Sequence, residues 1–358
     1  MSYLEQRLEK DLNSIRDQIA KQANLAQKSI ENAVLSVQTG NHRLAHETVL
    51  NDHQMNRNMR TIDRLCHSFI AVHLPSAGHL RLLSSAIRVN IELERIGDYA
   101  VTVAREGVQM AHPPSGRMAR ELERLSGETL LMLRQSITAF NTLNAEMAKS
   151  TMAIANQLES SLDGVYEEMM SADQRETVKD TLAMFVIFTQ VKRVADQAKN
   201  LCEETVFAAT GDQKAPKVYK VLFVDEENNL LSQMAEAAAR INFPESGAYQ
   251  SAGRNPAPKV DPRLASFLEQ RGRQPNHLAT RGIDELSHQQ LQEQTVIVSL
   301  QGKIADYFPT LPFHTAALEW EIPAPGEDAE NGEMEAVYRE IVLHVKELME
   351  LLRGEGAS

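Results

Sequence analysis

The sequence is poor in cysteine, in aromatic residues and in long apolar runs, and each shortage narrows what the protein can be. Only two cysteines occur, Cys66 and Cys202, without CxxC spacing, which excludes a disulfide scaffold or a cysteine-rich zinc site. We expect both to be buried, reduced thiols. Aromatic residues make up 5% of the chain, so any hydrophobic core must be mainly aliphatic.

Basic residues are also in deficit, with 37 lysines and arginines against 49 aspartates and glutamates and a formal net charge of −12. This charge argues against general nucleic-acid binding and against adhesion to an anionic membrane, because either surface would repel it. The first residues are charged, and no apolar run approaches the length of a membrane span. We therefore expect a cytoplasmic protein without signal peptide or membrane insertion. Its 358 residues suggest two or three domains.

Helical periodicity dominates the first 210 residues, and no strand-like alternation appears before residue 217. One clear apolar seam consists of Val89, Leu93, Ile96, Ala100 and Val103. The breaks between periodic segments predict six helices, at 4–37, 42–72, 77–111, 118–143, 145–170 and 172–210, with Ser171 as a cap before the last.

The third of these helices carries the most informative motif. Glu94 and Asp98 stand four residues apart, so their carboxylates lie one turn above the other on one side of the helix. The two charges repel, and Gly97 costs about 1 kcal/mol relative to alanine in a helix interior. A hard cation held by both carboxylates, with Gly97 admitting a neighbouring helix, would explain both costs. A solvated acidic face beside Arg95 and Arg105 is the alternative.

The motif belongs to a longer pattern. It comprises Glu-Arg-Ile-Gly-Asp at 94–98, Leu-Pro-Ser-Ala-Gly-His-Leu-Arg at 74–81 and Asn51-Asp52 in the preceding helix. Over residues 4–211 the chain resembles the PhoU family of phosphate-signalling regulators. A second copy, Lys-Arg-Val-Ala-Asp-Gln-Ala at 192–198, aligns with 94–100 and indicates an internal duplication of a three-helix unit. We predict tandem three-helix bundles at 1–112 and 117–212, as the resemblance implies.

The two copies differ in the residues that would hold a metal. On the first bundle we predict one divalent or iron-type site, with Glu94 and Asp98 as ligands and Asp52 of the neighbouring helix as a further candidate. On the second, Lys192 stands where the family carries glutamate, so its ammonium can pair with Asp196 and repel a cation. We therefore expect at most one competent metal site, and we expect the Lys192 ammonium to oppose metal binding by Asp196.

From residue 219 the pattern changes to short strands alternating with helices. Strands are predicted at 221–224, 249–253, 295–299 and 315–319, and helices at 233–241, 263–271 and 335–352. Such alternation predicts a small α/β domain with a parallel sheet over residues 218–358. The predicted fold is thus a multi-domain one, with two three-helix bundles followed by this α/β domain.

The α/β region resembles the low-molecular-weight tyrosine phosphatase and arsenate reductase fold. The resemblance covers 218–353 and is carried by residues 222–224, Asn228, Ser232, 234–236, 251–253, 261–263 and 320–323. Such enzymes need a thiolate nucleophile, an arginine that clamps the phosphate and an aspartic acid that protonates the leaving group. The aligned positions hold Asp225, Leu231 and Ala324, so we expect no catalytic residues here.

The loop after the first strand of this region has changed its charge as well. A strand-to-helix loop ordinarily holds an anion with free N–H groups at the positive end of the helix dipole. Here Asp225, Glu226 and Glu227 are expected to satisfy that end internally and to repel phosphate. The alternative is that Asp225 is itself a nucleophile or a metal ligand. The loop, however, has no lysine or arginine to stabilise a transferring phosphoryl group.

Three functions can be weighed from these patterns. The PhoU resemblance implies a non-enzymatic regulator that restrains phosphate uptake and the phosphate-starvation response. It would act by contact with the ATPase or membrane subunits of a phosphate ABC transporter and with a sensor histidine kinase, and we expect a homodimer. The alternatives are a metal-binding helical bundle and a phosphatase or arsenate reductase activity in the C-terminal domain.

Overall fold

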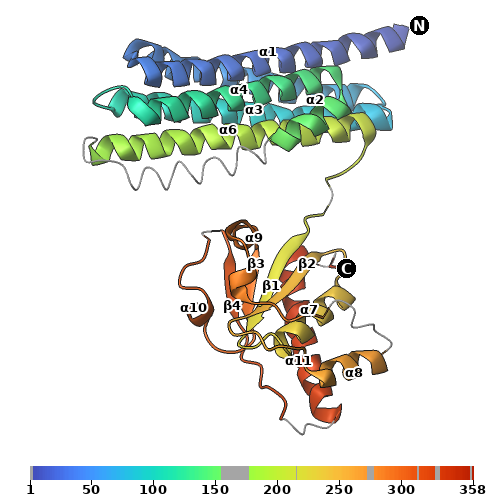
Figure 1. Ribbon diagram of the computed structural model, residues 1–358. Helices are drawn as coiled ribbons and strands as arrows, with labels where there is room; N and C mark the ends of the chain where they lie inside the picture. Colours follow the sequence, from blue (N-terminus) through green and yellow to red (C-terminus); the bar gives the residue numbers. More distant parts are fainter. Residues whose placement is uncertain are drawn as a thin grey trace. The chain divides into compact units, whose positions relative to one another are not determined.

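The chain divides into two compact units, Met1–Lys214 and Ala215–Ser358 (Figure 1). The computed structural model describes residues 3–154, 177–214, 216–271, 278–312, 314–326, 331–354 and 357–358. The first unit contains long helices, and the second contains a parallel sheet covered by helices. This confirms the predicted fold class.

The helices of the first unit are α1 (Tyr3–Thr39), α2 (His42–Val72), α3 (Ala77–Gln109), α4 (Gly116–Thr142) and α6 (Val178–Thr210), and residues 145–154 are also helical. Three of these helices begin after an N-cap side chain that accepts a backbone N–H: Asn41 from Leu44, Ser76 from His79 and Thr177 from Asp180. The last of these corrects the predicted start at 172, because Thr177 supplies the cap. Ser171, the predicted cap, lies outside the described residues.

The two motif-bearing helices, α3 and α6, run antiparallel along each other. Three contacts fix this alignment: the Ala111 N–H donates to Asp180 at 3.0 Å, Gln197 Nε2 donates to the Tyr99 hydroxyl at 3.4 Å, and Arg88 pairs with Glu204 at 2.6 Å. Tyr99 and Gln197 are equivalent positions of the internal repeat. The duplicated helices therefore meet near their equivalent motifs, as expected for repeats related by an approximate twofold axis.

The core of the helical unit is mainly aliphatic and is continuous across α1, α2, α3, α4 and α6. The predicted seam of α3 is buried along its length, with Val89, Leu93, Ile96, Ala100 and Val103 each at most 1% exposed. Cys66 and Cys202 are free and buried, as predicted, and burial raises the pKa of each thiol to about 12. The division of this unit into bundles at 1–112 and 117–212 stays a prediction.

The α/β unit is built on four parallel strands in the order β2-β1-β3-β4. They are β1 (Tyr219–Asp225), β2 (Gly247–Gly253), β3 (Val296–Ser299) and β4 (Ala316–Glu319), close to the predicted segments and all parallel. The predicted helices appear as α7 (Leu231–Asn242), α8 (Pro262–Gln270) and α11 (Asn331–Arg353). The short elements η1 (Ile283–Glu285), α9 (His288–Gln292) and α10 (Ile304–Tyr307) were not predicted, since one turn leaves no periodic signal.

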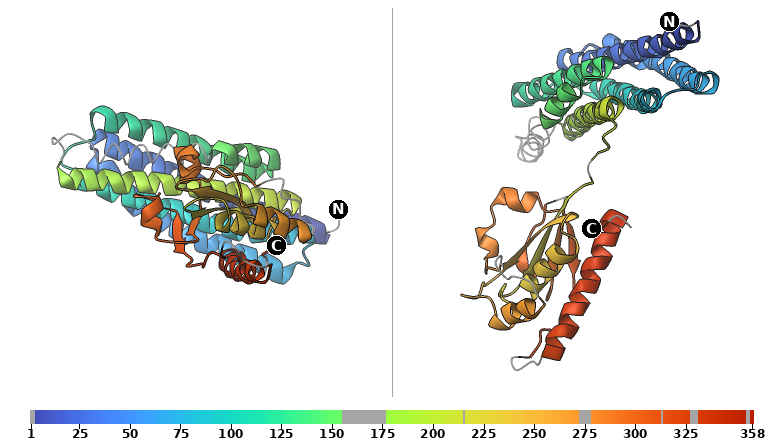
Figure 2. Two further views of the ribbon diagram at one scale, coloured as in Figure 1. Left: turned by 60° about the horizontal axis from the view of Figure 1, so that its bottom comes forward. Right: turned by 90° about the vertical axis from the view of Figure 1, so that its right-hand side faces the viewer.

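Strand β1 is buried on both faces, which explains its uninterrupted apolar run. Val221 and Phe223 pack into a core with side chains of α7, α8 and α11, whereas Leu222 and Val224 pack into a second core with Ile304 and Phe308. Figure 2 shows α11 as the long helix of this unit. Because the strands are parallel, their carboxyl ends meet at one edge of the sheet, where Asp225 lies.

Candidate functional site

The acidic motif of α3 lies against α2, and Gly97 is the reason that the two helices approach closely. A Cβ atom at Gly97 would lie 2.8 Å from Met55 Cε and 3.3 Å from Asp52 Oδ1. Met55 is buried beneath it, where Ser29 Oγ contacts its sulfur at 3.7 Å. Gly97 thus admits Asp52 and Met55 of α2 to the surface of α3, which was the use predicted for this glycine.

The structure brings the three predicted metal ligands into one electrostatic neighbourhood. Burial raises the pKa of Glu94, and the charges of Asp98 and Asp52 raise it further. Burial likewise raises the pKa of Asp52, reinforced by the charge of Asp98. Asp52 Oδ2 accepts from Asn56 Nδ2 at 2.7 Å, whereas its buried Oδ1 has no hydrogen-bond partner among the described residues. This unpartnered oxygen lies 3.3 Å from the position that a Cβ atom at Gly97 would take.

The three carboxylates do not yet form a closed coordination sphere. Asp98 is exposed and Glu94 is half-buried, and within the described part of the chain no group of three or more His, Cys, Asp or Glu is arranged to hold a metal ion. In the second copy Asp196 is exposed and Lys192 is half-buried at the position of Glu94. The oxygen donors suit a hard cation chemically, but the ligands of the first copy would have to converge on it.

In the α/β unit, the Asp225 side chain occupies the centre of its own strand-to-helix loop. Its Oδ1 accepts from the Asn228 N–H at 2.5 Å and its Oδ2 from the Ser232 N–H at 2.8 Å, and the residue is 4% exposed. Ser232 lies in the first turn of α7, so the carboxylate caps that helix. The prediction that this loop satisfies its helix end internally is confirmed for Asp225.

Asn228, one of the residues that carry the resemblance to the phosphatase fold, holds the loop in shape. It adopts the left-handed backbone region at φ 48° and is fully buried. Its side chain donates to Ser232 Oγ at 2.8 Å and accepts from Gln233 Nε2 and from the Arg281 N–H. Asn228 and Ser232 were named from the family resemblance, but no periodicity in the sequence reveals which partners Asn228 meets.

The other loop carboxylates face outward and keep the mouth of the loop negative. Glu226 accepts from Asn255 Nδ2 at 2.5 Å, and Glu227 accepts from Asn229 Nδ2 at 2.6 Å; both glutamates are exposed. The pKa of Tyr307 is raised to about 12, by burial and then by the charges of Asp225 and Glu226. An arriving phosphate would therefore meet carboxylates where an anion-binding loop presents N–H groups.

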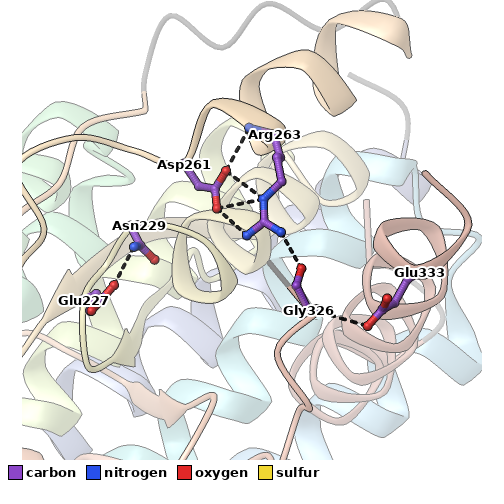
Figure 3. A network of polar contacts seen from close by, with 6 residues as sticks. All are labelled: Glu227, Asn229, Asp261, Arg263, Gly326 and Glu333. Atoms are coloured by element: carbon purple, nitrogen blue, oxygen red, sulfur yellow. Dashed lines mark hydrogen bonds and ion pairs between the residues drawn. The ribbon is translucent and has the colours of Figure 1, made fainter. Parts of the chain in front are cut away.

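The remaining two positions of the expected catalytic set hold the apolar side chains of Leu231 and Ala324. Leu231 is the first residue of α7 and is 3% exposed in the core, and Ala324 is exposed in the segment after β4. A network holds this segment, as Figure 3 shows: Arg263 pairs with Asp261 at 2.6 Å and donates to the Gly326 carbonyl at 2.5 Å. The Arg263 guanidinium lowers the pKa of Asp261. The network holds the backbone of this segment at Gly326, whose N–H also donates to Glu333.

Comparison with known proteins matches each unit to a separate family. A PhoU domain model matches residues 19–107 and 122–205, and a low molecular weight phosphotyrosine protein phosphatase model matches 220–358. The phosphate-specific transport system accessory protein PhoU of Serratia marcescens is 25% identical over 203 residues, 56% of this chain and 84% of that protein. A PhoU homolog of Pseudomonas putida is 26% identical over 213 residues, 58% and 83% of the two chains.

The helical unit also resembles a solved structure. The crystal structure of PhoU from Pseudomonas aeruginosa has a TM-score of 0.55 and 26% sequence identity, and the match covers 57% of this chain and 99% of that one. No described helix of the chain combines the length and the apolarity needed to cross a bilayer.

Proposed function

We propose that this chain, which carries PhoU domains in its N-terminal part and a low-molecular-weight phosphatase-like domain in its C-terminal part, is a regulator of phosphate homeostasis. It would restrain phosphate uptake and the phosphate-starvation response from the cytoplasm, by contact with a phosphate ABC transporter and a sensor histidine kinase. The single observation that carries this proposal is the PhoU match to both halves of the helical unit. Its relatives are named as accessory proteins of phosphate-specific transport systems.

Under this proposal the protein acts through surfaces, and its C-terminal domain does no phosphatase chemistry. The Asp225 carboxylate fills the loop, Leu231 is a core residue, and Ala324 has no proton to give. Inorganic phosphate and p-nitrophenyl phosphate should therefore find no site in the natural chain. Hydrolysis by the purified protein that disappears in Asp225→Ala would overturn this part of the proposal and leave the regulatory part standing.

Deletion of the gene tests the regulatory role directly. A strain without the protein should express its phosphate-starvation genes in phosphate-rich medium and take up phosphate faster, and the full chain supplied in trans should reverse both effects. Co-purification of transporter or kinase subunits with the tagged chain from phosphate-replete cells tests the contact. Normal repression in the deletion strain would contradict the proposal.

Light scattering of the purified protein tests the proposed homodimer.

A metal site on the first PhoU domain is the second candidate function, and the orphaned Asp52 Oδ1 favours it. Glu94 and Asp98 of α3 and Asp52 of α2 would hold one divalent or iron-type cation, which would neutralise three mutually repelling carboxylates. Elemental analysis should find about one metal ion per chain and none in Glu94→Gln/Asp98→Asn, where the ligand charges are removed. A matched variant, Asp196→Asn, should keep the metal, because Lys192 opposes binding in the second copy. Equal metal content in all three proteins would contradict the site.

A further inference from the structure

The outward face of α2 carries one continuous line of side chains. Its members are separated by alternating steps of four and three residues, which places them in a single row along the helix. The row is His46, Leu50, His53, Arg57, Arg60, Arg64, His67 and Ala71, and all eight are exposed. The buried residues of α2, such as Met55, Ile62 and Phe69, lie on the opposite side, where the helix packs against α1 and α3.

This row, termed the basic stripe, is unusual for so acidic a chain. It contains three arginines and three histidines and no acidic residue, whereas the whole chain has a formal net charge of −12. Glu47 is the one exposed acidic residue among the described residues of α2, and it pairs with Arg43 at 2.9 Å. Asp63 is half-buried and accepts from Asn90 of α3 at 3.1 Å. The half-buried Asp52 interacts electrostatically with His53, so the exposed charges of the stripe itself are those of its arginines and histidines.

The three arginines also lack partners elsewhere in the described structure. Several exposed arginines elsewhere in the chain form ion pairs: Arg88 with Glu204, Arg124 with Glu121 and Arg339 with Glu335. Within the described residues, Arg57, Arg60 and Arg64 make no ion pair and no side-chain hydrogen bond. Their guanidinium groups are thus available for carboxylates of another molecule, to which arginine binds in a bidentate geometry.

We propose that the basic stripe is a docking face for an acidic helix of a partner protein. The proposal rests on the proposed function, in which the chain acts by contact with other proteins. The four-and-three spacing is the spacing of helix-to-helix seams, so a partner helix lying lengthwise would meet every member of the stripe. Arg57 and Arg64 are seven residues apart, about 10 Å along the helix, which two turns of a partner helix match.

Exposed apolar side chains near the stripe favour a protein partner over a nucleic acid. Leu50 is 65% exposed within the stripe, and Leu74, just beyond its end, is fully exposed. Apolar side chains at both ends of a charged stripe suit a partner with an apolar and acidic surface.

The test compares two variants of equal charge change in the full chain. The stripe variant is Arg57→Glu/Arg60→Glu/Arg64→Glu, and the control variant is Arg7→Glu/Arg120→Glu/Arg134→Glu, which changes exposed arginines of α1 and α4. Circular dichroism and thermal unfolding establish that both are folded. Binding is measured to the purified cytoplasmic domain of the sensor kinase and to the purified ATPase of the transporter, at several salt concentrations.

We expect the stripe variant to bind the partner at least about tenfold more weakly than the natural chain, mainly through a slower association rate, and the control variant to bind normally. Natural binding should weaken as salt rises, and that of the stripe variant should not. Equal affinity of the two variants would overturn the docking face and leave the proposed function intact. If the natural chain binds neither partner, both proposals fail. Binding to anionic vesicles that the stripe variant loses would identify a lipid surface and overturn the protein partner.

A photo-crosslinker at Leu50 locates the contact on the partner. Leu50 lies in the stripe but carries no charge, so its replacement leaves the arginines in place. The crosslinked peptide should come from a helix with aspartate or glutamate at three- and four-residue spacing. Crosslinks confined to a segment without such residues would overturn the acidic helix.

Discussion

The carboxylate of Asp225 receives the N–H groups that an anion-binding loop offers to its ligand. Asp225→Ala would leave two buried N–H groups without an acceptor, one of them in the first turn of α7. We expect the free energy of unfolding of the α/β unit to fall by about 1–3 kcal/mol. Glu226→Ala is the matched control, since this exposed neighbour should cost no more than about 0.5 kcal/mol. Urea denaturation of the two variants measures the difference, and equal costs would contradict the capping role.

The effect of Asp98→Asn on the stability of the helical unit should depend on whether a metal ion is bound by Asp52, Glu94 and Asp98. In the metal-free protein Asp98 raises the pKa of both Glu94 and Asp52. Removing its charge should stabilise the helical unit by a few tenths of a kcal/mol at pH 7. If the proposed site binds Mn²⁺, the same variant should gain less stability from added Mn²⁺ than the natural chain does. Thermal unfolding in EDTA and in Mn²⁺ gives both values; a loss of stability in EDTA would contradict the repulsion.

The repulsion also predicts a dependence on pH. Glu94 and Asp52 have pKa values raised above the ordinary 4.5 and 3.8, so the folded state binds more protons than the unfolded state in the interval above those values. Their contribution to stability is therefore larger at low pH and is lost as pH rises. The metal-free advantage of Asp98→Asn should be present at pH 7 and should shrink toward pH 4. An advantage that does not change with pH would indicate a cause other than these charges.

At the scale of helices, close packing and helix propensity oppose each other at Gly97. Gly127 in α4 is the control, because nothing lies within 4 Å of the position its Cβ would take. Gly127→Ala should raise the free energy of unfolding by about 1 kcal/mol, the usual difference in helix propensity. Gly97→Ala should not, because its Cβ would lie 2.8 Å from Met55 Cε in a buried contact. Equal stabilisation by both substitutions, measured by thermal unfolding, would show that Gly97 is not a packing requirement.

The elements themselves were largely predictable from the sequence, and the site contacts were not. The seam from Val89 to Val103 and the apolar run of β1 are periodic, so they indicated a helix and a buried strand directly. The contact of Gly97 with Met55 joins residues 42 positions apart, and periodicity within a segment cannot specify such a pair. The bonds from Asn228 and Ser232 to Asp225 depend on the left-handed turn at Asn228. Asp52 was anticipated because it was part of a family resemblance.

At the scale of the molecule, the helical unit and the α/β unit have separate cores. The PhoU matches end at residue 205, inside the first unit, and the phosphatase match begins at residue 220, inside the second. Because residues 1–214 keep all the packing between α3 and α6, we expect this segment to fold alone. Its helical circular dichroism and cooperative thermal unfolding would demonstrate this.

The same segment separates the regulatory surface from the phosphatase-like domain. If regulation depends on contacts of the helical unit, residues 1–214 should restore phosphate-dependent repression in a deletion strain, whereas residues 215–358 should not. The basic stripe lies wholly within the first segment, so 1–214 carrying Arg57→Glu/Arg60→Glu/Arg64→Glu should fail where 1–214 with the α1 and α4 control substitutions succeeds. Reporter expression in phosphate-rich medium, with immunoblots to equalise protein levels, distinguishes these results. Restoration by the full chain alone would make the Asp225-filled domain a required part of the regulator, because it would then supply a contact that the helices lack.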